Sequence, residues 1–169
     1  MQILLDTKQL QLTIKRLSQQ LVEDAEMLDN IVFIGIQPRG TKFSDSIIAE
    51  ITNLCPVEKI NYGLLDITFY RDDIRNELHI ANNTHIPFSI EGKKVILIDD
   101  VLYTGRTTRA ALDALQDFGR PRKVELCVLI DRRFNRELPI QPDFCGKAID
   151  TMVSQKVKVE WDHKRVVIN

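Results

Sequence analysis

Two adjacent carboxylates, Asp99 and Asp100, follow the apolar run of residues 95–98, which is typical of a buried strand. Adjacent carboxylates at the edge of a sheet can accept hydrogen bonds from hydroxyl groups or hold a hydrated magnesium ion. The short polar segment of residues 104–108 comes next and leads into a helical pattern. It offers backbone amides at a helix N-terminus, hydroxyl donors and a cation, which together suit a phosphate. The pattern therefore predicts a ligand with a diol beside a phosphate, as in a phosphorylated ribose.

The candidate ligand-binding stretch is continuous and consists of Asp99, Asp100, Val101, Leu102, Tyr103, Thr104, Gly105, Arg106, Thr107 and Thr108. Glycine carries no side chain, so Gly105 lets the backbone approach a phosphate closely. The stretch matches neither the P-loop pattern GxxxxGK followed by Ser or Thr nor the dinucleotide pattern GxGxxG. Classical P-loop and dinucleotide sites therefore lack their residues here.

Strand and helix patterns alternate along the chain, without an internal repeat or a low-complexity linker. An amphipathic helix is predicted after a cap at Asp6 or Thr7, with apolar residues at helical spacing from Leu10 to Leu28. The further expected elements are a strand at 31–36, a helix over 43–54, a β-rich stretch at 60–70, a strand at 95–98, a helix ending at 118–119, a strand at 124–130 and a hairpin of 157–160 with 165–168. This order predicts an α/β fold with a mostly parallel sheet covered on both faces, and a C-terminal hairpin outside it as a lid or hood. In such sheets ligands bind beyond the carboxyl ends of the strands.

Composition narrows the class of protein further. The 169 residues, 44% hydrophobic and 28% charged, fit one globular domain. A net charge of -1 argues against binding nucleic acid or anionic membrane through overall charge, although a local basic face stays open. The three cysteines lack metal-type spacing, which favours free thiols in a reducing compartment. No run approaches the roughly 20 apolar residues that span a bilayer, so we expect a cytoplasmic protein without membrane contact.

The stretch around Asp99 is similar to the 5-phosphoribosyl 1-pyrophosphate (PRPP) signature of the type I phosphoribosyltransferases, an apolar strand, two acids and a threonine- and glycine-rich loop that opens a helix. Over nearly the whole chain, the sequence also resembles the bifunctional family of pyrimidine-operon attenuation proteins and uracil phosphoribosyltransferases, the PyrR type. The matching segments are "GIQPRG" at 35–40, "LDITFYRDDI" at 65–74, "DRRFNRELPIQPDFCGK" at 131–147 and the C-terminal tail. The resemblance implies the type I phosphoribosyltransferase fold, as one domain over 1–169 with a hood at about 131–169.

The resemblance also implies a role for each matching residue. Asp99 and Asp100 would accept hydrogen bonds from the ribose hydroxyls, and residues 104–108 would cradle the 5-phosphate. The other implied site residues are Arg39 and Gly40 for the pyrophosphate, Tyr70 and Arg71 in a mobile loop that closes over the substrate, Asp131 and Arg132 near magnesium or nucleotide, and Lys147 and Val153 at the base. Asp99, Asp100, Arg39 and Arg71 would be catalytic. Mg2+ would be carried mainly by PRPP, with Asp99, Asp100 and Asp131 as ligands through water.

The activity implied by the resemblance is transfer of the phosphoribosyl group of PRPP to uracil, which yields UMP and pyrophosphate. Two alternatives stay open, an RNA-binding attenuator with little catalysis and a salvage transferase for another base such as a purine. An attenuator would bind the leader messenger RNA of a pyrimidine operon, as a homodimer or higher homo-oligomer. The basic residues available for RNA are Lys8, Lys15, Arg16, Arg75, Arg120, Arg122 and Lys123.

One segment departs from the family pattern. The family usually reads aspartate-arginine-glycine-histidine-arginine before "ELP", whereas residues 131–136 of this chain read "DRRFNR". The glycine and the histidine are missing, and the segment is one residue longer. We therefore expect the hood and the way it holds the base to differ here, while the phosphoribosyl motif and the fold stay the same.

Overall fold

The computed structural model describes residues 1–25, 28–56, 58–72 and 83–169. Its larger sheet has five strands in the order β3-β2-β4-β5-β6, and every neighbouring pair is parallel. The strands are β2 (Ile31–Gln37), β3 (Asn61–Asp66), β4 (Lys94–Leu102), β5 (Lys123–Arg133) and β6 (Phe144–Asp150). The predicted α/β class and the parallel sheet are confirmed.

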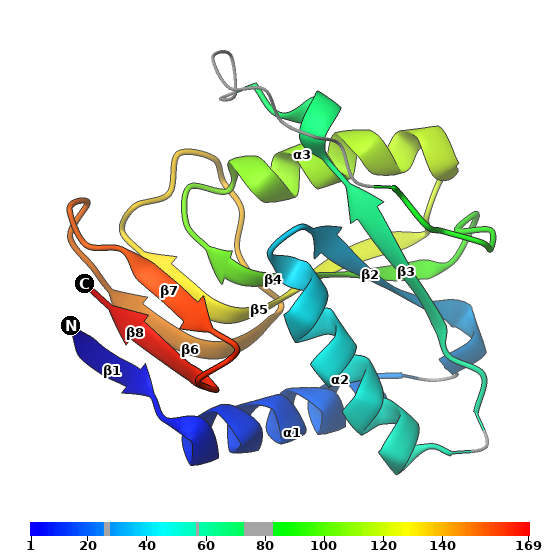
Figure 1. The fold of residues 1–169 in the computed structure, drawn as a ribbon. Helices are drawn as coiled ribbons and strands as arrows, with labels where there is room; N and C mark the ends of the chain where they lie inside the picture. The colour runs from blue at the N-terminus through cyan, green and yellow to red at the C-terminus, as the bar shows by residue number, and fades with distance from the viewer. Residues whose placement is uncertain (26–27, 57, 73–82) are drawn as a thin grey trace.

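Helices cover both faces of this sheet (Figure 1), with α1 (Thr7–Glu23) and α2 (Gly40–Leu54) on one face and α3 (Arg106–Leu115) on the other. Asp6 caps α1, since its side chain accepts the Gln9 amide at 2.8 Å while the Gln9 side chain accepts the Asp6 amide at 3.0 Å. Two apolar cores result, because neighbouring strand residues such as Phe33 and Ile34 point to opposite faces. No helix among the described residues combines the length and apolarity needed to cross a bilayer.

A smaller antiparallel sheet in the order β1-β8-β7 lies at the side of the molecule where β5 ends (Figure 1). The predicted C-terminal hairpin is confirmed as β7 (Val157–Glu160) and β8 (Arg165–Ile168). Strand β1 (Gln2–Leu5), which the sequence analysis did not predict, pairs with β8 and brings the two ends of the chain together. A strand of four residues is too short to show a clear alternation in sequence.

Several predicted boundaries were wrong. β4 continues through Asp99 and Asp100, and β5 continues through Asp131 to Arg133, so these charged residues lie within strands and not after them. The predicted strands stopped at the first charge, because charged residues are rarely buried in a sheet. α1 ends at Glu23, and Leu28 lies in the short turn η1 (Leu28–Asn30). β6 was not predicted, since most of its side chains are exposed or half-buried.

Candidate active site

Two buried carboxylates lie near the end of β4, the central strand of the larger sheet. Asp99 and Asp100 are 5% and 8% exposed, and the Asp100 amide donates a hydrogen bond to Oδ1 of Asp99 over 2.9 Å. The pair therefore lies in the middle of the carboxyl edge, which is where open α/β sheets bind their ligands.

Burial raises the pKa of both carboxyl groups, and that of Asp99 lies well above its usual range. The charge of Asp100 raises the pKa of Asp99 further, whereas the guanidinium of Arg39 opposes both shifts. An added cation or hydrogen-bond donor would favour the ionised forms of these groups. The pair is therefore suited to receive hydroxyl groups or a hydrated cation.

The N-terminus of α2 meets the carboxylate pair from the side of β2. Gly40 begins α2, and a Cβ added there would lie 2.6 Å from the carbonyl oxygen of Ile98 and 3.1 Å from Cα of Asp99. Only glycine fits at this distance from a backbone oxygen. The positive end of the α2 dipole and the exposed residue Arg39 therefore lie beside two carboxylates. The helix end and Arg39 suit an anion, and the neighbouring carboxylates suit hydroxyl groups.

The polar segment after β4 forms a loop that opens α3. Gly105 adopts a φ of 93°, a conformation that favours glycine. The carbonyl of Thr104 accepts the amide of Glu137 over 3.0 Å, which attaches the loop between β5 and β6 to this segment. Thr107 is half-buried and Thr108 is buried in the first turn of α3. The amides of such a first turn have no partner within the helix, which is the property that suits a phosphate.

Carboxylates already engage the guanidinium of Arg106 in this loop. Nε donates to Glu137 over 2.6 Å and Nη1 donates to Asp72 over 3.1 Å. Arg109, one turn further along α3, donates to the same oxygen of Asp72 over 3.0 Å. Arg106 therefore links the phosphate-type loop both to the segment after β3 and to the segment after β5.

A third carboxylate, Asp131 in β5, is buried and pairs in register with Leu102 of β4. Arg136 donates to this carboxylate and to the carbonyl oxygen of Tyr103. Asp131 lines a cavity of about 790 Å³ together with Arg133, Phe134 and residues 136–142. Ile140, which lines this cavity, lies beside the phosphate-type loop, since a Cβ on Gly105 would lie 3.3 Å from its side chain.

Three further residues predicted for the site lie on or near the smaller sheet. Arg132 is buried at the end of β5, and its guanidinium lies over the ring of Tyr103. Val153 is exposed in the turn between β6 and β7. Lys147 of β6 donates to the carbonyl oxygen of Leu4 over 2.9 Å, so its ammonium group attaches β6 to β1.

The expected mobile loop begins after the short helix η2 (Thr68–Tyr70). The hydroxyl of Tyr70 donates to Asp117 in η3 (Gln116–Phe118), and this hydrogen bond raises the pKa of Tyr70. Arg71 follows and is half-buried. The remainder of the expected loop, with Arg75, falls in residues 73–82 and lies outside the described residues.

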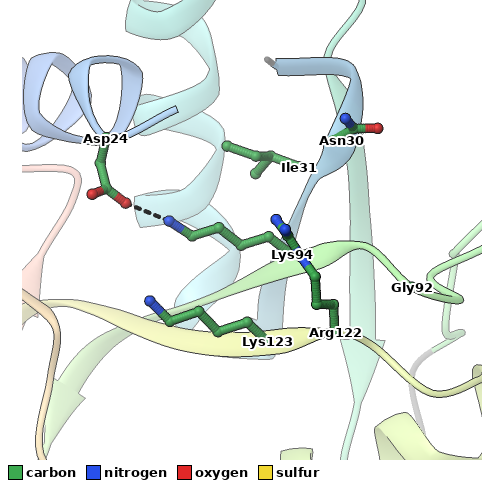
Figure 2. Close-up of a pocket in the computed structure, with 7 residues that line it drawn as sticks. All are labelled: Asp24, Asn30, Ile31, Gly92, Lys94, Arg122 and Lys123. Atoms are coloured by element: carbon green, nitrogen blue, oxygen red, sulfur yellow. Dashed lines mark hydrogen bonds and ion pairs between the residues drawn. The ribbon is translucent and has the colours of Figure 1, made fainter. Parts of the chain in front are cut away.

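A second cavity, of about 600 Å³, opens at the opposite edge of the sheet, where β4 and β5 begin (Figure 2). Lys94 is buried there and pairs with Asp24 at the end of α1 and with Glu125 over 2.8 Å. Lys123 pairs with the other oxygen of Glu125. Carboxylates therefore balance two of the basic side chains that line this cavity, and the third is Arg122.

Sequence reasoning missed Arg136 and Glu137, which the fold places against Asp131 and Arg106. Their signal was the alternation of charges in "DRRFNRE" at 131–137. A charge-rich segment in a loop is more often a solvated surface, so the alternation alone did not single them out. Contacts between this loop and the loop after β4 are needed to identify them.

Comparisons with known proteins agree with this geometry. Residues 1–164 match the phosphoribosyl transferase domain family. Bifunctional protein PyrR of Haemophilus ducreyi is 46% identical over 163 residues, which make up 95% of this chain and 90% of that protein. A hypoxanthine phosphoribosyltransferase of Staphylococcus aureus has a TM-score of 0.69 at 26% identity, covering 88% of this chain and 77% of that one. The hypoxanthine phosphoribosyltransferase of Trypanosoma cruzi has a TM-score of 0.76 over 99% of this chain and 95% of its own, at 16% identity that shows the fold alone. The resemblance and the type I fold are confirmed, and the chain belongs to the phosphoribosyl transferase domain family and, within it, to the bifunctional PyrR proteins.

Proposed function

We propose that this protein transfers the 5-phosphoribosyl group of PRPP to uracil and releases UMP and pyrophosphate. One observation carries the proposal, namely that the buried pair Asp99 and Asp100 is separated only by residues 101–103 from the loop that opens α3. Acceptors for a diol thus lie beside amides and hydroxyls that suit a phosphate. Membership of the bifunctional PyrR group supports uracil as the base.

Ribose and its 5-phosphate are held at two points in this proposal. Asp99 and Asp100 accept hydrogen bonds from the 2- and 3-hydroxyls. The amides and threonine hydroxyls of residues 104–108 bind the 5-phosphate, with Gly105 allowing close approach. The intervening residues 101–103 set the spacing between the two points, which fixes the anomeric carbon relative to the sheet edge.

The leaving group is bound at the start of α2. Displacement of pyrophosphate builds positive charge on the ribose ring and negative charge on the leaving oxygen, and both must be stabilised. Arg39 and the backbone at Gly40 stabilise the pyrophosphate. A ring nitrogen of uracil bonds to the anomeric carbon as the bond from that carbon to pyrophosphate breaks, and the proton of the ring nitrogen passes to solvent. No covalent enzyme intermediate is needed.

Mg2+ fits the donors at this edge of the sheet. Carboxylate oxygens are ligands that Mg2+ prefers, and it is usually held by one or two carboxylates together with substrate phosphates and water. Among the described residues, no three carboxylate, histidine or cysteine side chains converge on one point. Asp99, Asp100 and Asp131 would hold the ion through water, with PRPP as its main carrier. When bound, the ion would neutralise charge on the departing pyrophosphate.

The base and the closing segment complete the proposed site. We place the base on the side of the smaller sheet, near Asp131, Arg132 and Val153. In this proposal Tyr70 and Arg71 close over PRPP and exclude water from the reacting atoms. Both proposals rest on the positions of these residues, at the end of β5, after β6 and after β3, at the same carboxyl edge as Asp99.

The test of the transferase proposal is to mix the pure protein with PRPP, Mg2+ and each free base in turn, and to separate the nucleotides by chromatography. UMP should form from uracil together with one equivalent of pyrophosphate, and hypoxanthine and guanine should yield no nucleotide. A purine nucleotide as the main product would instead support a purine salvage enzyme. No product with any base would contradict the proposal.

We further propose that the protein binds the leader messenger RNA of a pyrimidine operon when UMP is present, as a homodimer or higher homo-oligomer in the cytoplasm. The observation that favours a second activity is the relatives' designation as bifunctional. Lys8, Lys15 and Arg16 are all exposed on α1, but the guanidinium of Arg16 already donates to the carbonyl oxygen of Gly146 over 2.6 Å. Exposed lysines are therefore the stronger candidates for phosphate contacts on this helix.

RNA binding can be measured with a labelled leader transcript in the presence and absence of UMP. Affinity should increase with UMP and fall steeply with added salt, because lysine contacts to phosphate release counterions. Light scattering on the same samples gives the oligomeric state. Lack of binding at low salt, or binding that salt leaves unchanged, would count against the RNA proposal and leave the transferase proposal intact.

A further inference from the structure

Arg132 is buried but its charge faces no carboxylate among the described residues. Its guanidinium donates to Oγ1 of Thr151 over 3.0 Å and to the carbonyl oxygens of Met152 over 3.4 Å and Gln155 over 2.8 Å. The guanidinium carbon also lies 3.9 Å from the centre of the Tyr103 ring. A buried cation is costly unless hydrogen bonds and polarisable groups surround it. The hydrogen-bond acceptors and the aromatic ring that contact Arg132 here belong to Tyr103 and to residues 151–155.

Asn135, in the loop after β5, also contacts Thr151. Its Nδ2 donates to the carbonyl oxygen of Thr151 over 2.9 Å and to Oγ1 of Thr151 over 3.2 Å. A third hydrogen bond, to the carbonyl oxygen of Arg133 over 3.0 Å, fixes the orientation of the amide. Arg132 and Asn135 both lie in the segment 131–136, in which this chain departs from the usual family pattern. Arg132 matches the family pattern and Asn135 does not, so the departure adds a second side chain that converges on Thr151 beside Arg132.

Residues 151–155, here called the 151–155 turn, are closed on themselves. The Met152 amide donates to Oε1 of Gln155 over 2.9 Å, and the Gln155 amide donates to the Met152 carbonyl over 3.1 Å. The side chains of Met152 and Val153 are 72% and 77% exposed, although both are apolar. The turn is thus held firmly from the side of Arg132 and Asn135, while it leaves two apolar side chains uncovered. Apolar side chains of this kind suit the flat face of a nucleobase.

We infer that Arg132 and Asn135 are positioning residues that hold the 151–155 turn against Tyr103 and thereby set where the base lies relative to the ribose. This inference rests on the proposed transferase function. Tyr103 directly precedes the loop that would bind the 5-phosphate. The contact of Arg132 with the Tyr103 ring therefore fixes the position of the 151–155 turn relative to that loop. The base and the phosphoribosyl group are then aligned by one connected set of contacts. Neither positioning side chain needs to touch the substrate.

The variants Thr151→Val and Asn135→Ala test the inference with little change in volume or fold. Asn135→Ala removes neutral hydrogen bonds to the turn, so the KM for uracil should rise about 3- to 10-fold. Thr151→Val also removes the hydrogen bond from the charged Arg132, so its KM for uracil should rise at least as much. The KM for PRPP should stay within about twofold of the wild type, because the phosphate loop keeps its own contacts. Ser154→Ala is the matched control, since Ser154 is exposed in the same turn and outside both sets of contacts, and it should leave both KM values unchanged.

Amide hydrogen exchange supplies a readout that does not depend on turnover. In both variants the amides of Met152 and Gln155 should exchange faster than in the wild type, while those of residues 104–108 should keep their rates. Equal rises in the two KM values would show a general structural effect and overturn the inference, as would an unchanged KM for uracil. If the wild type converts a different base, the same comparison is made with that base. If the wild type converts no base, the proposed function fails, and this inference fails with it.

Discussion

At the scale of single residues, the carboxylates of Asp99 and Asp100 decide whether the proposed chemistry is correct. Their burial costs stability in the absence of ligand, which is common for groups that serve a function. We predict that Asp99→Asn and Asp100→Asn each lower kcat/KM for PRPP by about ten- to a hundredfold, since a hydrogen bond to a charged acceptor is worth about 1.5–3 kcal/mol. The melting temperature should stay level or rise, because each change removes one of two adjacent like charges.

Steady-state kinetics and a thermal melt on both variants distinguish this prediction from a structural role for the acids. Carboxylates that only cap α3 or pair with Arg106 would be needed for the fold. In that case the melting temperature would fall, and the folded fraction would keep its activity. Unchanged kinetics in both variants would exclude the ribose role.

The raised pKa values of this pair also predict how stability depends on pH. A carboxyl with a higher pKa in the folded state than in the unfolded state, where Asp titrates near about 3.9, binds more protons when folded, so stability falls as pH rises between the two values. Asp99→Asn removes the part of this dependence that Asp99 contributes. The measurement is urea unfolding of Asp99→Asn and the wild type from pH 4 to 8. The stability advantage of Asp99→Asn should be small at low pH and grow as pH rises. Its total increase should be about 1.4 kcal/mol for each unit by which the pKa of Asp99 is raised. If the free energies of unfolding of Asp99→Asn and the wild type change with pH in parallel, the pKa of the Asp99 carboxyl is not raised in the folded protein.

At the scale of secondary-structure elements, the contact between the start of α2 and β4 is as important as any side chain. Gly40→Ala should lower both stability and kcat/KM, because the new Cβ would meet the backbone oxygen of Ile98 and force α2 away from the carboxylates. Overpacking of this kind costs about 1–3 kcal/mol. Urea unfolding and kinetics measure the two effects, and the control is Ser46→Ala, a half-buried position of α2 whose hydroxyl donates to the Lys42 carbonyl of the same helix. A variant as stable as the wild type would show that α2 can shift freely.

A different prediction concerns Arg71, in the segment after η2, since we propose that this residue contacts the substrate and does not stabilise the fold. Arg71→Ala should lower kcat far more than it lowers the melting temperature, because a half-buried loop side chain contributes little to the free energy of unfolding. Phe69→Ala is a matched control in the same segment, with an exposed side chain. Full activity of Arg71→Ala would remove this residue from the mechanism, and a large loss of stability would make it structural.

At the scale of the whole molecule, Lys94 of β4 pairs with Asp24 after α1 (Figure 2) and with Glu125 of β5, so it connects three elements on the edge opposite to the carboxylate pair. Burial lowers its pKa, but the hydrogen bonds of Asp24 and Glu125 outweigh this effect and raise it. Lys94→Met should destabilise the protein by about 1–3 kcal/mol, since it leaves buried Glu125 with fewer partners. The double variant Lys94→Met with Glu125→Leu should recover most of the loss, because apolar groups can replace a buried ion pair.

The free energy of unfolding of the two variants, measured in urea, tests this role. The kcat of both should match that of the wild type at 25 °C, because the cavity around Lys94 shares no residues with the carboxyl edge. Loss of activity in a fully folded Lys94→Met variant would show that the two edges are coupled. A double variant less stable than the single one would show that the ion pair itself, and not the burial of an unpaired charge, stabilises this edge.

The sequence by itself predicted the parallel α/β sheet, the C-terminal hairpin and the stretch from Asp99 to Thr108. These signals are local, because a buried strand, a pair of acids and the first turn of a helix follow one another in the chain. It did not predict β1, which becomes a strand only by pairing with β8. Nor did it predict that Asp99 and Asp131 lie inside strands, since hydropathy alone places charged residues at strand ends.

Only the tertiary structure decided which polar groups from distant segments meet. Arg136 contacts Asp131, Arg106 lies between Asp72 and Glu137, and Arg132 binds the 151–155 turn and stacks on Tyr103. The hydrophobic periodicity of the sequence cannot predict such contacts. Each joins residues from distant segments, and the strand order and the path of a loop determine how close those residues come. Sequence patterns report what a segment does with its own neighbours, whereas the geometry of a site depends on backbone positions that only the packing of the whole chain determines.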